Sequence, residues 1–167
     1  MRGQRGRQSR YSVQLEEKQN LKRVFGLREE QLKRYYREAV AKRDAESGPY
    51  LIELLERRLD NALFRAGVAA TRPQARQMAS HRLITVNGRV VNIPSFRLKA
   101  GDVVTVKESK RAKAYFTTYE KRMQNVQTPA WIELDNKNFS FKITGRPVPE
   151  EAKLAIDAQA VVELLSR

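Results

Sequence analysis

Apolar residues recur at helical spacing through the N-terminal part of the sequence. The spacing predicts a helix over 12–25, in which Ser12 serves as the N-cap and Gly26 provides the left-handed residue that ends it. A second helix is predicted over 28–43. Its apolar stripe consists of Leu32, Tyr35, Tyr36, Ala39 and Val40. Tyrosines among such neighbours are usually core residues, although stacking on nucleic-acid bases is the alternative.

The most regular helical pattern covers 51–63 and follows a polar loop over 44–50. Apolar residues recur there at the i, i+3 and i+4 positions, which predicts one continuous helix. Glu53 and Glu56 lie near its start and are followed by two arginines, an order that the helix dipole favours. Because the composition changes at this helix, it marks a candidate boundary between a helical section and a mixed section.

A further short helix is predicted to begin at Thr71. The Thr71 hydroxyl can accept a hydrogen bond from a free amide of the first turn, where Pro73 also fits because no N–H is needed there. The small apolar residues fall on one side of this helix, namely Ala75, Met78 and Ala79. The other side carries Arg72, Arg76 and Gln77.

After this helix the pattern changes from helical spacing to alternation, which is typical of strands. The predicted segments are a strand over 83–86, a turn at Asn87-Gly88, a strand over 89–91, a turn at Gly101-Asp102 and a strand over 103–106. Asn-Gly between two such runs is the strongest short signal for a hairpin. Residues 57–106 are therefore predicted to form a short helix pair on a small antiparallel sheet.

The last third of the chain combines a hairpin with helices. The predicted segments are a basic loop over 107–113, a helix over 114–126, a hairpin over 131–143 with its turn at 135–138, a break at 146–149 and a final helix capped by Asp157. The final helix has an apolar face of Val161, Val162 and Leu165 that needs a partner. Residues 112–167 contain eight basic and seven acidic residues, so they are interpreted as structural support.

Charge adds a functional indication to this pattern. The net charge is +14 and the pI is near 10.4, which points to nucleic acid or an anionic membrane as the partner. No apolar run approaches the roughly 18 residues of a membrane-spanning helix, so no membrane partner is expected. Residues 57–111 contain twelve basic and only three acidic residues. A solvated outer face normally mixes both signs, so the excess favours a face that binds a polyanion.

Candidate catalytic chemistry is lacking in the sequence. The chain has no cysteine and one histidine, so the usual zinc ligands are missing, and the absence of cysteine suits a reducing cytoplasm. His81 lies between a predicted helix and a predicted strand and is interpreted as a contact or packing residue. Asp60 and Asp102 are isolated acids, interpreted as a local cap and a turn residue. No phosphate-binding glycine loop is present, and we expect no enzyme, metal or cofactor.

The N-terminal segment 1–10 contains four arginines and no acidic residue. It is either a disordered tail or an arm that becomes ordered along RNA phosphates, and the basicity of the chain favours the arm. Phosphate contacts are expected to provide affinity, with Gln77, Asn61 and Asn87 adding local polar contacts. The candidate RNA-binding residues are Arg2, Arg5, Arg7, Arg10, Lys18, Lys22, Arg23, Lys33, Arg34, Arg37, Arg57, Arg58, Asn61, Arg65, Arg72, Arg76, Gln77, His81, Arg82, Asn87 and Arg89.

Several motifs occur in the order found in one protein family. They are Gln14-Leu-Glu-Glu-Lys-Gln, Leu55-Glu-Arg-Arg-Leu-Asp-Asn, Thr71-Arg-Pro-Gln-Ala-Arg-Gln, Val86-Asn-Gly-Arg-Val-Val-Asn-Ile-Pro-Ser and Val162-Glu-Leu. With these motifs the chain resembles the bacterial small-subunit ribosomal protein four family from about Gly3 to Arg167. The resemblance implies direct binding to the five-prime domain of 16S ribosomal RNA, at a junction of several RNA helices and early in subunit assembly.

The same resemblance implies an α+β architecture. A basic arm over 1–11 would precede a helical domain over 12–54 and 148–167, and an RNA-binding domain over 55–147, with its core at 57–106, would be inserted in it. The final helix would then pack on 12–52. Expected neighbours are ribosomal proteins five and three, and messenger RNA where the arm lies near its entry path. The expected location is the ribosome, in the cytoplasm or in an organelle.

The chain differs from the family in two respects, and the helix-pair module leaves two alternative functions. Family members usually begin about forty residues earlier, sometimes with zinc-binding cysteines, so contacts of that extension and any zinc are not expected here. Arg5 stands where the family usually has histidine. The helix-pair module also occurs in RNA-modifying enzymes such as pseudouridine synthases, in tyrosyl-tRNA synthetases and in free ribosome-associated factors. The short flanking segments and the extent of the resemblance favour the ribosomal protein.

Overall fold

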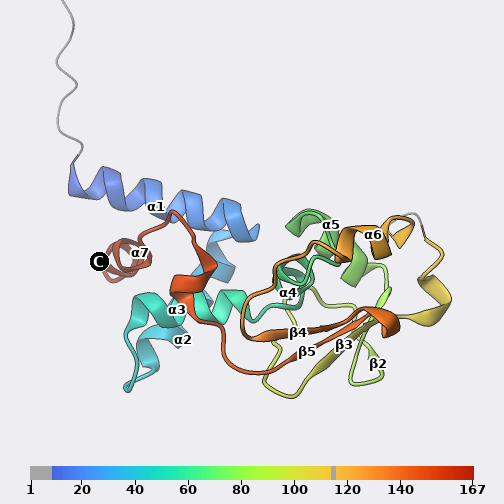
Figure 1. Ribbon diagram of the computed structural model, residues 1–167. Coiled ribbons are helices and arrows are strands. Elements are labelled where there is room, and N and C mark those ends of the chain that lie inside the picture. Colours follow the sequence, from blue (N-terminus) through green and yellow to red (C-terminus); the bar gives the residue numbers. More distant parts are fainter. Residues whose placement is uncertain (1–8, 114–115) are drawn as a thin grey trace, which may run out of the picture. The chain divides into compact units, whose positions relative to one another are not determined.

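The computed structural model describes residues 9–113 and 116–167, which form two compact units (Figure 1). The first, called the helical unit below, contains the described residues up to Ile52 together with Leu154–Arg167. The second, the mixed unit, is the continuous segment Glu53–Lys153. The divisions lie at 52/53 and 153/154, whereas the predicted divisions are at 54/55 and 147/148.

The helical unit joins the beginning of the described chain to its end. Its helices are α1 (Arg10–Phe25), α2 (Glu29–Ala41), most of α3 (Ser47–Glu56) and α7 (Ala158–Leu165). The apolar C-terminal helix α7 packs against α1 and also contacts α2, which confirms its expected return to the early helices. Residues Leu21, Phe25, Leu32, Leu51 and Val161 are buried in this unit.

The ends of these helices follow from local capping. Helix α1 begins earlier than predicted, because Ser9 rather than Ser12 is the N-cap and its hydroxyl oxygen accepts the Ser12 amide at 3.1 Å. Gly26 ends the helix with φ 65°, as predicted. Asp157 caps α7 as predicted, with its carboxylate accepting the Ala160 amide at 3.2 Å.

Two predictions in this unit are wrong in detail. Val40 was assigned to the apolar stripe of α2 but is 43% exposed, while Tyr35 and Tyr36 are only half-buried. The predicted polar loop over 44–50 is shorter, because α3 already begins at Ser47. A side chain at Gly48 would come within 3.0 Å of Gln159, so the first turn of α3 lies close to α7.

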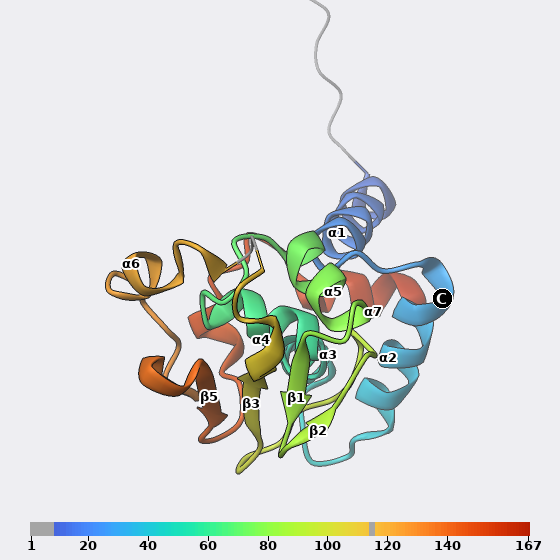
Figure 2. The ribbon, with the colours of Figure 1, turned by 90° about the vertical axis from the view of Figure 1, so that its right-hand side faces the viewer.

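The mixed unit places helices against a sheet (Figure 2). Its elements are α4 (Leu59–Arg65), α5 (Arg72–Ser80), β1 (Ile84–Val86), β2 (Arg89–Val90), β3 (Val103–Val106), η1 (Glu108–Lys110), α6 (Tyr119–Met123), β4 (Ile132–Asp135), η3 (Asn136–Asn138), β5 (Ser140–Ile143) and η4 (Pro149–Ala152). Within the described residues, the strands form an antiparallel sheet in the order β2-β1-β3-β5-β4. Helices α4, α5 and α6 lie on one side of it (Figure 1). The α+β class is therefore confirmed.

One core is shared by the helices and the inner face of this sheet. Alternate strand residues point into it, because successive side chains of a strand face opposite sides. Its strand residues include Ile84, Val86, Val104, Val106, Phe141 and Ile143. Leu59 and Leu63 from α4 and Met78 from α5 pack into the same core. The apolar residues that recur at helical spacing in α4 and α5 are therefore the ones that these helices bury.

The predicted continuous helix over 51–63 is wrong, because the chain becomes extended at Arg58 between α3 and α4. Arg58 has φ −65° and ψ 142° and forms an isolated β-bridge with Arg97. The Leu98 amide donates to the Arg57 carbonyl at 2.8 Å, and the Leu59 amide donates to the Phe96 carbonyl at 2.8 Å. Hydrogen bonds to a segment forty residues later thus replace those that a continuous helix would make.

Helix α5 and the hairpin of β1 and β2 form where the capping and turn residues of the sequence predict them. Thr71 caps α5 by accepting the Gln74 amide at 3.1 Å, and the hairpin turn has φ 51° at Asn87 and φ 83° at Gly88. Two consecutive positive φ values identify the turn type that Asn-Gly favours between antiparallel strands. Asp102 confirms its turn role, because its carboxylate accepts the Lys99 amide at 2.9 Å.

The last part of the mixed unit contains less helix than predicted. The predicted helix over 114–126 is represented by α6, and residues 114 and 115 lie outside the described residues. The basic loop over 107–113 contains the short helix η1. The predicted hairpin over 131–143 is confirmed, with β4 and β5 joined through η3 at the predicted turn.

Candidate nucleic-acid interface

Two buried acids lie beneath the arginines of α4 and α5. Glu56 ends α3 and is 1% exposed, and Asp60 lies in the first turn of α4 and is 2% exposed. A carboxylate can remain charged in such a place only when cations and hydrogen-bond donors replace water. Both acids have such partners, and together with Arg58, Arg65, Arg72 and Arg76 they form what we call the arginine cluster.

Arg58 and Asp60 form the deepest pair of the arginine cluster. Nε and Nη2 of Arg58 donate to the two carboxylate oxygens of Asp60 at 3.1 and 3.0 Å. The Asn61 amide donates to Oδ1 of Asp60 at 2.7 Å. Arg58 is predicted to be an exposed residue that contacts RNA. The predicted exposure is wrong, because Arg58 is only 4% exposed. Its extended backbone directs the guanidinium to the side of α4 instead of the solvent.

Arg65 forms a second two-point ion pair with Glu56. Its Nε and Nη2 donate to Oε2 and Oε1 of Glu56 at 3.0 and 2.6 Å. Nη2 also donates to the Ala152 carbonyl at 3.2 Å. The Arg65 side chain keeps 20% exposure, so this guanidinium is fixed while one edge still reaches solvent.

Asn61 connects the two pairs and is completely buried. Its side-chain nitrogen donates to the Glu56 carbonyl at 2.9 Å and to Oε2 of the same residue, and its side-chain oxygen accepts Nε of Arg72 at 2.9 Å. All of its amide functions are therefore used inside the protein. The predicted RNA contact of Asn61 is corrected accordingly, because a residue with 0% exposure cannot reach a bound nucleic acid.

The arginines of α5 lie at the outer edge of the arginine cluster. The guanidinium of Arg72 lies 4.5 Å from the centre of the Phe64 ring, a cation–π contact. Burial, with a smaller contribution from Arg65, lowers the pKa of Arg72 to about 10, so it remains charged at neutral pH. Arg76 keeps 37% exposure of its side chain, and its Nε lies 3.6 Å from Oδ2 of Asp60.

The arginine cluster therefore combines four guanidinium groups with two carboxylates. The excess positive charge lies on guanidinium groups, and the buried side chains of Asp60, Glu56 and Asn61 fix the positions of these groups. Arg58 and Arg65 already use two donors each on these acids, whereas Arg76 keeps 37% exposure of its side chain. A planar guanidinium group that is held in place and still reaches solvent suits phosphate oxygens, because it can bind them without a large loss of side-chain entropy.

The remaining candidates of the mixed unit differ in exposure. Gln77, His81, Arg82 and Arg89 are exposed, as an RNA-binding role requires. Arg82 follows α5 in the left-handed region with φ 62°, and its amide donates to the Ala79 carbonyl at 3.0 Å. Arg57 is half-buried, and its Nε donates to the Leu98 carbonyl at 2.9 Å. Arg57, Arg82 and Arg89 add positive charge to the mixed unit outside the arginine cluster.

Asn87 has a structural task that the sequence prediction missed. Its side-chain nitrogen donates to Oδ1 of Asp102 at 2.9 Å, and its side-chain oxygen accepts the Val103 amide at 2.9 Å. Asn87 thus ties the two turns of the sheet together. These bonds use one N–H and one lone pair of the side-chain amide, and Asn87 is exposed, so its predicted contact with RNA stays a prediction.

The candidates on the helical unit are partly engaged with acids. Lys18 and Lys22 both donate to Glu29 at 2.8 Å, and these hydrogen bonds lower the pKa of Glu29 to about 2. Arg10 donates to Glu163 at 2.9 Å and lowers its pKa. Exposed candidates are Arg23, Arg34 and Arg37, with Lys33 half-buried. Arg2, Arg5 and Arg7 lie outside the described residues.

The sequence prediction also missed the acids that organise the arginines. Glu56 and Asp60 were interpreted as a helix-start acid and a local cap, and neither was expected to pair with arginine. A signal was present, since Leu55-Glu-Arg-Arg-Leu-Asp-Asn places one acid before and one acid after its two arginines. Isolated acids in so basic a stretch indicate internal ion pairs.

The described part of the chain offers neither a metal site nor a membrane-spanning helix. Residues 9–113 and 116–167 hold no group of three or more histidines, cysteines or acids arranged around a common point. In the same ranges, every helix is too short or too polar to cross a lipid bilayer.

Comparisons with known proteins cover nearly all of the chain. Residues 57–104 match the family model described as the S4 domain, and residues 1–56 match the model described as the ribosomal protein S4/S9 N-terminal domain. The small ribosomal subunit protein uS4 of Chromobacterium violaceum is 42% identical over 163 residues, which are 98% of this chain and 79% of that protein. The S4-domain match includes most of the arginine cluster and the whole Asn87 hairpin.

Proposed function

The chain belongs to the uS4 family of small-ribosomal-subunit proteins, and from this premise we propose that it is a structural component of the small subunit that binds 16S ribosomal RNA directly. The family is one of ribosomal proteins, which are structural rather than enzymatic, so the ribosome is the expected location. The observation that carries the proposal is the arginine cluster, most of which lies within the residues matched by the S4 domain.

Binding is proposed to depend on phosphate contacts from a surface that is formed before the RNA arrives. Arg72, Arg76, Arg82 and Arg89 supply positive charge at the surface, while Asp60 and Glu56 fix the arginines nearest to them. A side chain that is already held loses little conformational entropy on binding. Contacts to phosphate release counterions, so the affinity should fall steeply with salt concentration.

Selectivity for ribosomal RNA is proposed to come from shape. Fixed guanidinium groups match only those RNA folds that bring phosphates to the same spacing, because the backbone path of folded RNA is itself a recognition feature. Asn61, which is buried and uses its side-chain amide internally, supports this surface without contacting bases.

We also propose that the protein binds early in subunit assembly. Each of its two units has apolar residues buried within the chain itself, so the surface can be presented to RNA without another protein. Contacts with ribosomal proteins five and three and with messenger RNA stay predictions from the family resemblance.

The decisive experiment measures binding to naked 16S RNA and retention on the small subunit. A filter-binding or mobility assay with the five-prime domain transcript should show tight binding with a steep salt dependence. Nuclease footprinting should protect a helix junction. After a high-salt wash the protein should remain at one copy per small subunit. A free factor or an RNA-modifying enzyme would be lost in that wash, and this result would exclude a structural role.

A further inference from the structure

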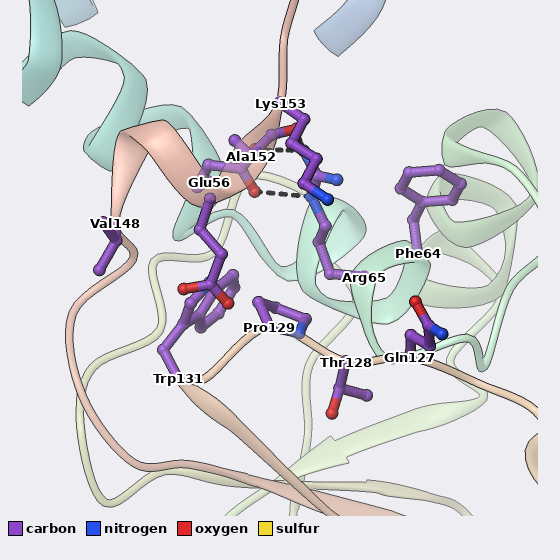
Figure 3. A pocket seen from close by; sticks show the side chains of 11 residues that line it. Glu56, Phe64, Arg65, Gln127, Thr128, Pro129, Trp131, Val148, Ala152 and Lys153 are labelled. Atoms are coloured by element: carbon purple, nitrogen blue, oxygen red, sulfur yellow. Dashed lines mark hydrogen bonds and ion pairs between the residues drawn. The ribbon is translucent and has the colours of Figure 1, made fainter.

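A cavity of about 420 Å³ lies in the mixed unit beside the arginine cluster (Figure 3). Three segments line it: the end of α3 with α4, the loop before β4 and the segment that includes η4. Cavities of this size are within the range that binds small organic ligands. We infer that it is a binding site for a single unstacked nucleotide of the RNA, an inference that rests on the proposed RNA-binding function.

The position of the cavity connects it to the proposed RNA surface. Arg65 belongs both to the arginine cluster and to the lining of the cavity. Phe64 also lines the cavity, and the guanidinium of Arg72 lies on its ring at 4.5 Å. An RNA strand whose phosphates contact the arginine cluster therefore lies close to the cavity, and a base that leaves the stack has a place to enter.

The walls suit a flat heteroaromatic ring better than an ion or an aliphatic chain. Phe64, Pro129 and Trp131 contribute ring surfaces, and unstacked bases are commonly held against such rings. Gln127 and Thr128 add polar side chains to the lining, and Figure 3 shows both beyond Pro129, on the side away from Trp131. These groups can donate to and accept from the edge of a base.

The charged groups of the lining favour a base inside the cavity and the phosphate of the same nucleotide at its edge. Glu56 accepts both donors of Arg65, and Glu151 accepts the Ala130 amide, so both acids are engaged within the protein. The lining as a whole has balanced charge, which disfavours a free anion inside it. Lys153 is exposed and lines the cavity from the end of η4, where it can contact the 5′-phosphate of a nucleotide whose base lies inside.

The test uses the full-length protein and two sets of probes. Trp131 is the only tryptophan of the chain and lines the cavity, so its indole N–H signal in a nitrogen–proton NMR spectrum reports on the site directly. The probes are the four ribonucleosides, their 5′-monophosphates and inorganic phosphate, each at millimolar concentration. The nucleosides and the monophosphates are expected to shift the signals of Trp131 and Ala130.

Lys153→Asn separates the two parts of the site. Lys153 has φ 50°, a conformation that asparagine tolerates, so the variant should fold normally. It should weaken monophosphate binding by about tenfold, the effect of one charge-assisted contact, and leave nucleoside binding unchanged. Lys137→Asn, an exposed lysine of η3 that does not line the cavity, is the matched control and should change neither.

Three results would overturn the inference. One is that no nucleoside or monophosphate shifts the Trp131 signal. Another is that inorganic phosphate shifts it as strongly as the monophosphates, which would make it an anion site. The third is that Lys153→Asn and Lys137→Asn behave alike. Binding of the 16S five-prime domain is measured on the same samples, so loss of the nucleotide site with RNA binding intact is distinguished from failure of the proposed function.

Discussion

The ion pair between Arg58 and Asp60 leads to a quantitative prediction for Asp60→Asn. The two side chains are 5% and 3% exposed, so the substitution leaves a guanidinium charge in a place that water does not reach. Removing one partner of such a pair typically costs about 3–5 kcal/mol. Since single domains are stable by only about 5–15 kcal/mol, Asp60→Asn should remove a large part of the stability of the mixed unit.

Urea unfolding followed by tryptophan fluorescence measures this loss in the correct unit, because Trp131 is the only tryptophan and is buried in the mixed core. The free energy of unfolding, extrapolated linearly to water, should fall by at least about 3 kcal/mol. The melting temperature should fall by roughly 12 °C or more, at about 4–8 °C per kcal/mol for a domain of this size.

Two further variants test whether the unpaired buried charge causes the loss of stability. Asp44→Asn is the matched control, because Asp44 is 80% exposed in a 3.5 Å pair with Lys42 and should change stability by less than about 1 kcal/mol. Arg58→Met combined with Asp60→Asn removes both charges, so it should be more stable than Asp60→Asn alone. A loss below about 1 kcal/mol in Asp60→Asn, or a double variant no better than the single one, would refute the reasoning that an uncompensated buried charge is responsible.

Three other predictions concern RNA affinity and pH. Arg82→Ala combined with Arg89→Ala should weaken binding to the 16S five-prime domain and reduce the slope of log affinity against log salt concentration by about 1.4–1.8. The melting temperature should not change, because both side chains are exposed. A lowered melting temperature with an unchanged slope would contradict this. Arg72→Ala should lower RNA affinity and also cost about 1–2 kcal/mol of stability, since Asn61 loses a partner and Phe64 its cation; a purely functional loss would contradict the structural part. The lowered pKa of Glu29, about 2 against an ordinary 4.5, gives stability that is present above pH 4.5 and lost as the pH falls toward 2. Because Glu29 is 36% exposed, the loss should be below about 1 kcal/mol, and Glu29→Gln should abolish this part of the acid dependence measured by circular dichroism.

Features set by neighbouring residues were predictable from the sequence. The caps at Thr71 and Asp157, the left-handed end of α1 at Gly26 and the hairpin at Asn87-Gly88 all depend on a few adjacent residues. Side-chain oxygens and positive φ values leave short sequence signals, so these predictions required no knowledge of the tertiary structure.

Features set by distant residues were not predictable in the same way. The break between α3 and α4 depends on hydrogen bonds with the segment 94–98, and helical periodicity alone gives no sign of it. The same break buries Arg58, so its assignment to the RNA surface failed for a tertiary reason. Asn87 shows a mixed case, because its turn was predicted correctly while its bonds to Asp102 and Val103 depend on the second hairpin.

The discontinuity of the helical unit has a consequence for synthesis of the protein. The mixed unit is one uninterrupted stretch, so it can fold while the chain is still being translated. Helices α1 and α2 must wait for α7, which is made last. A nascent chain terminated before Asp157 would therefore release a molecule that retains the arginine cluster but leaves an apolar face of α1 open to aggregation and proteolysis.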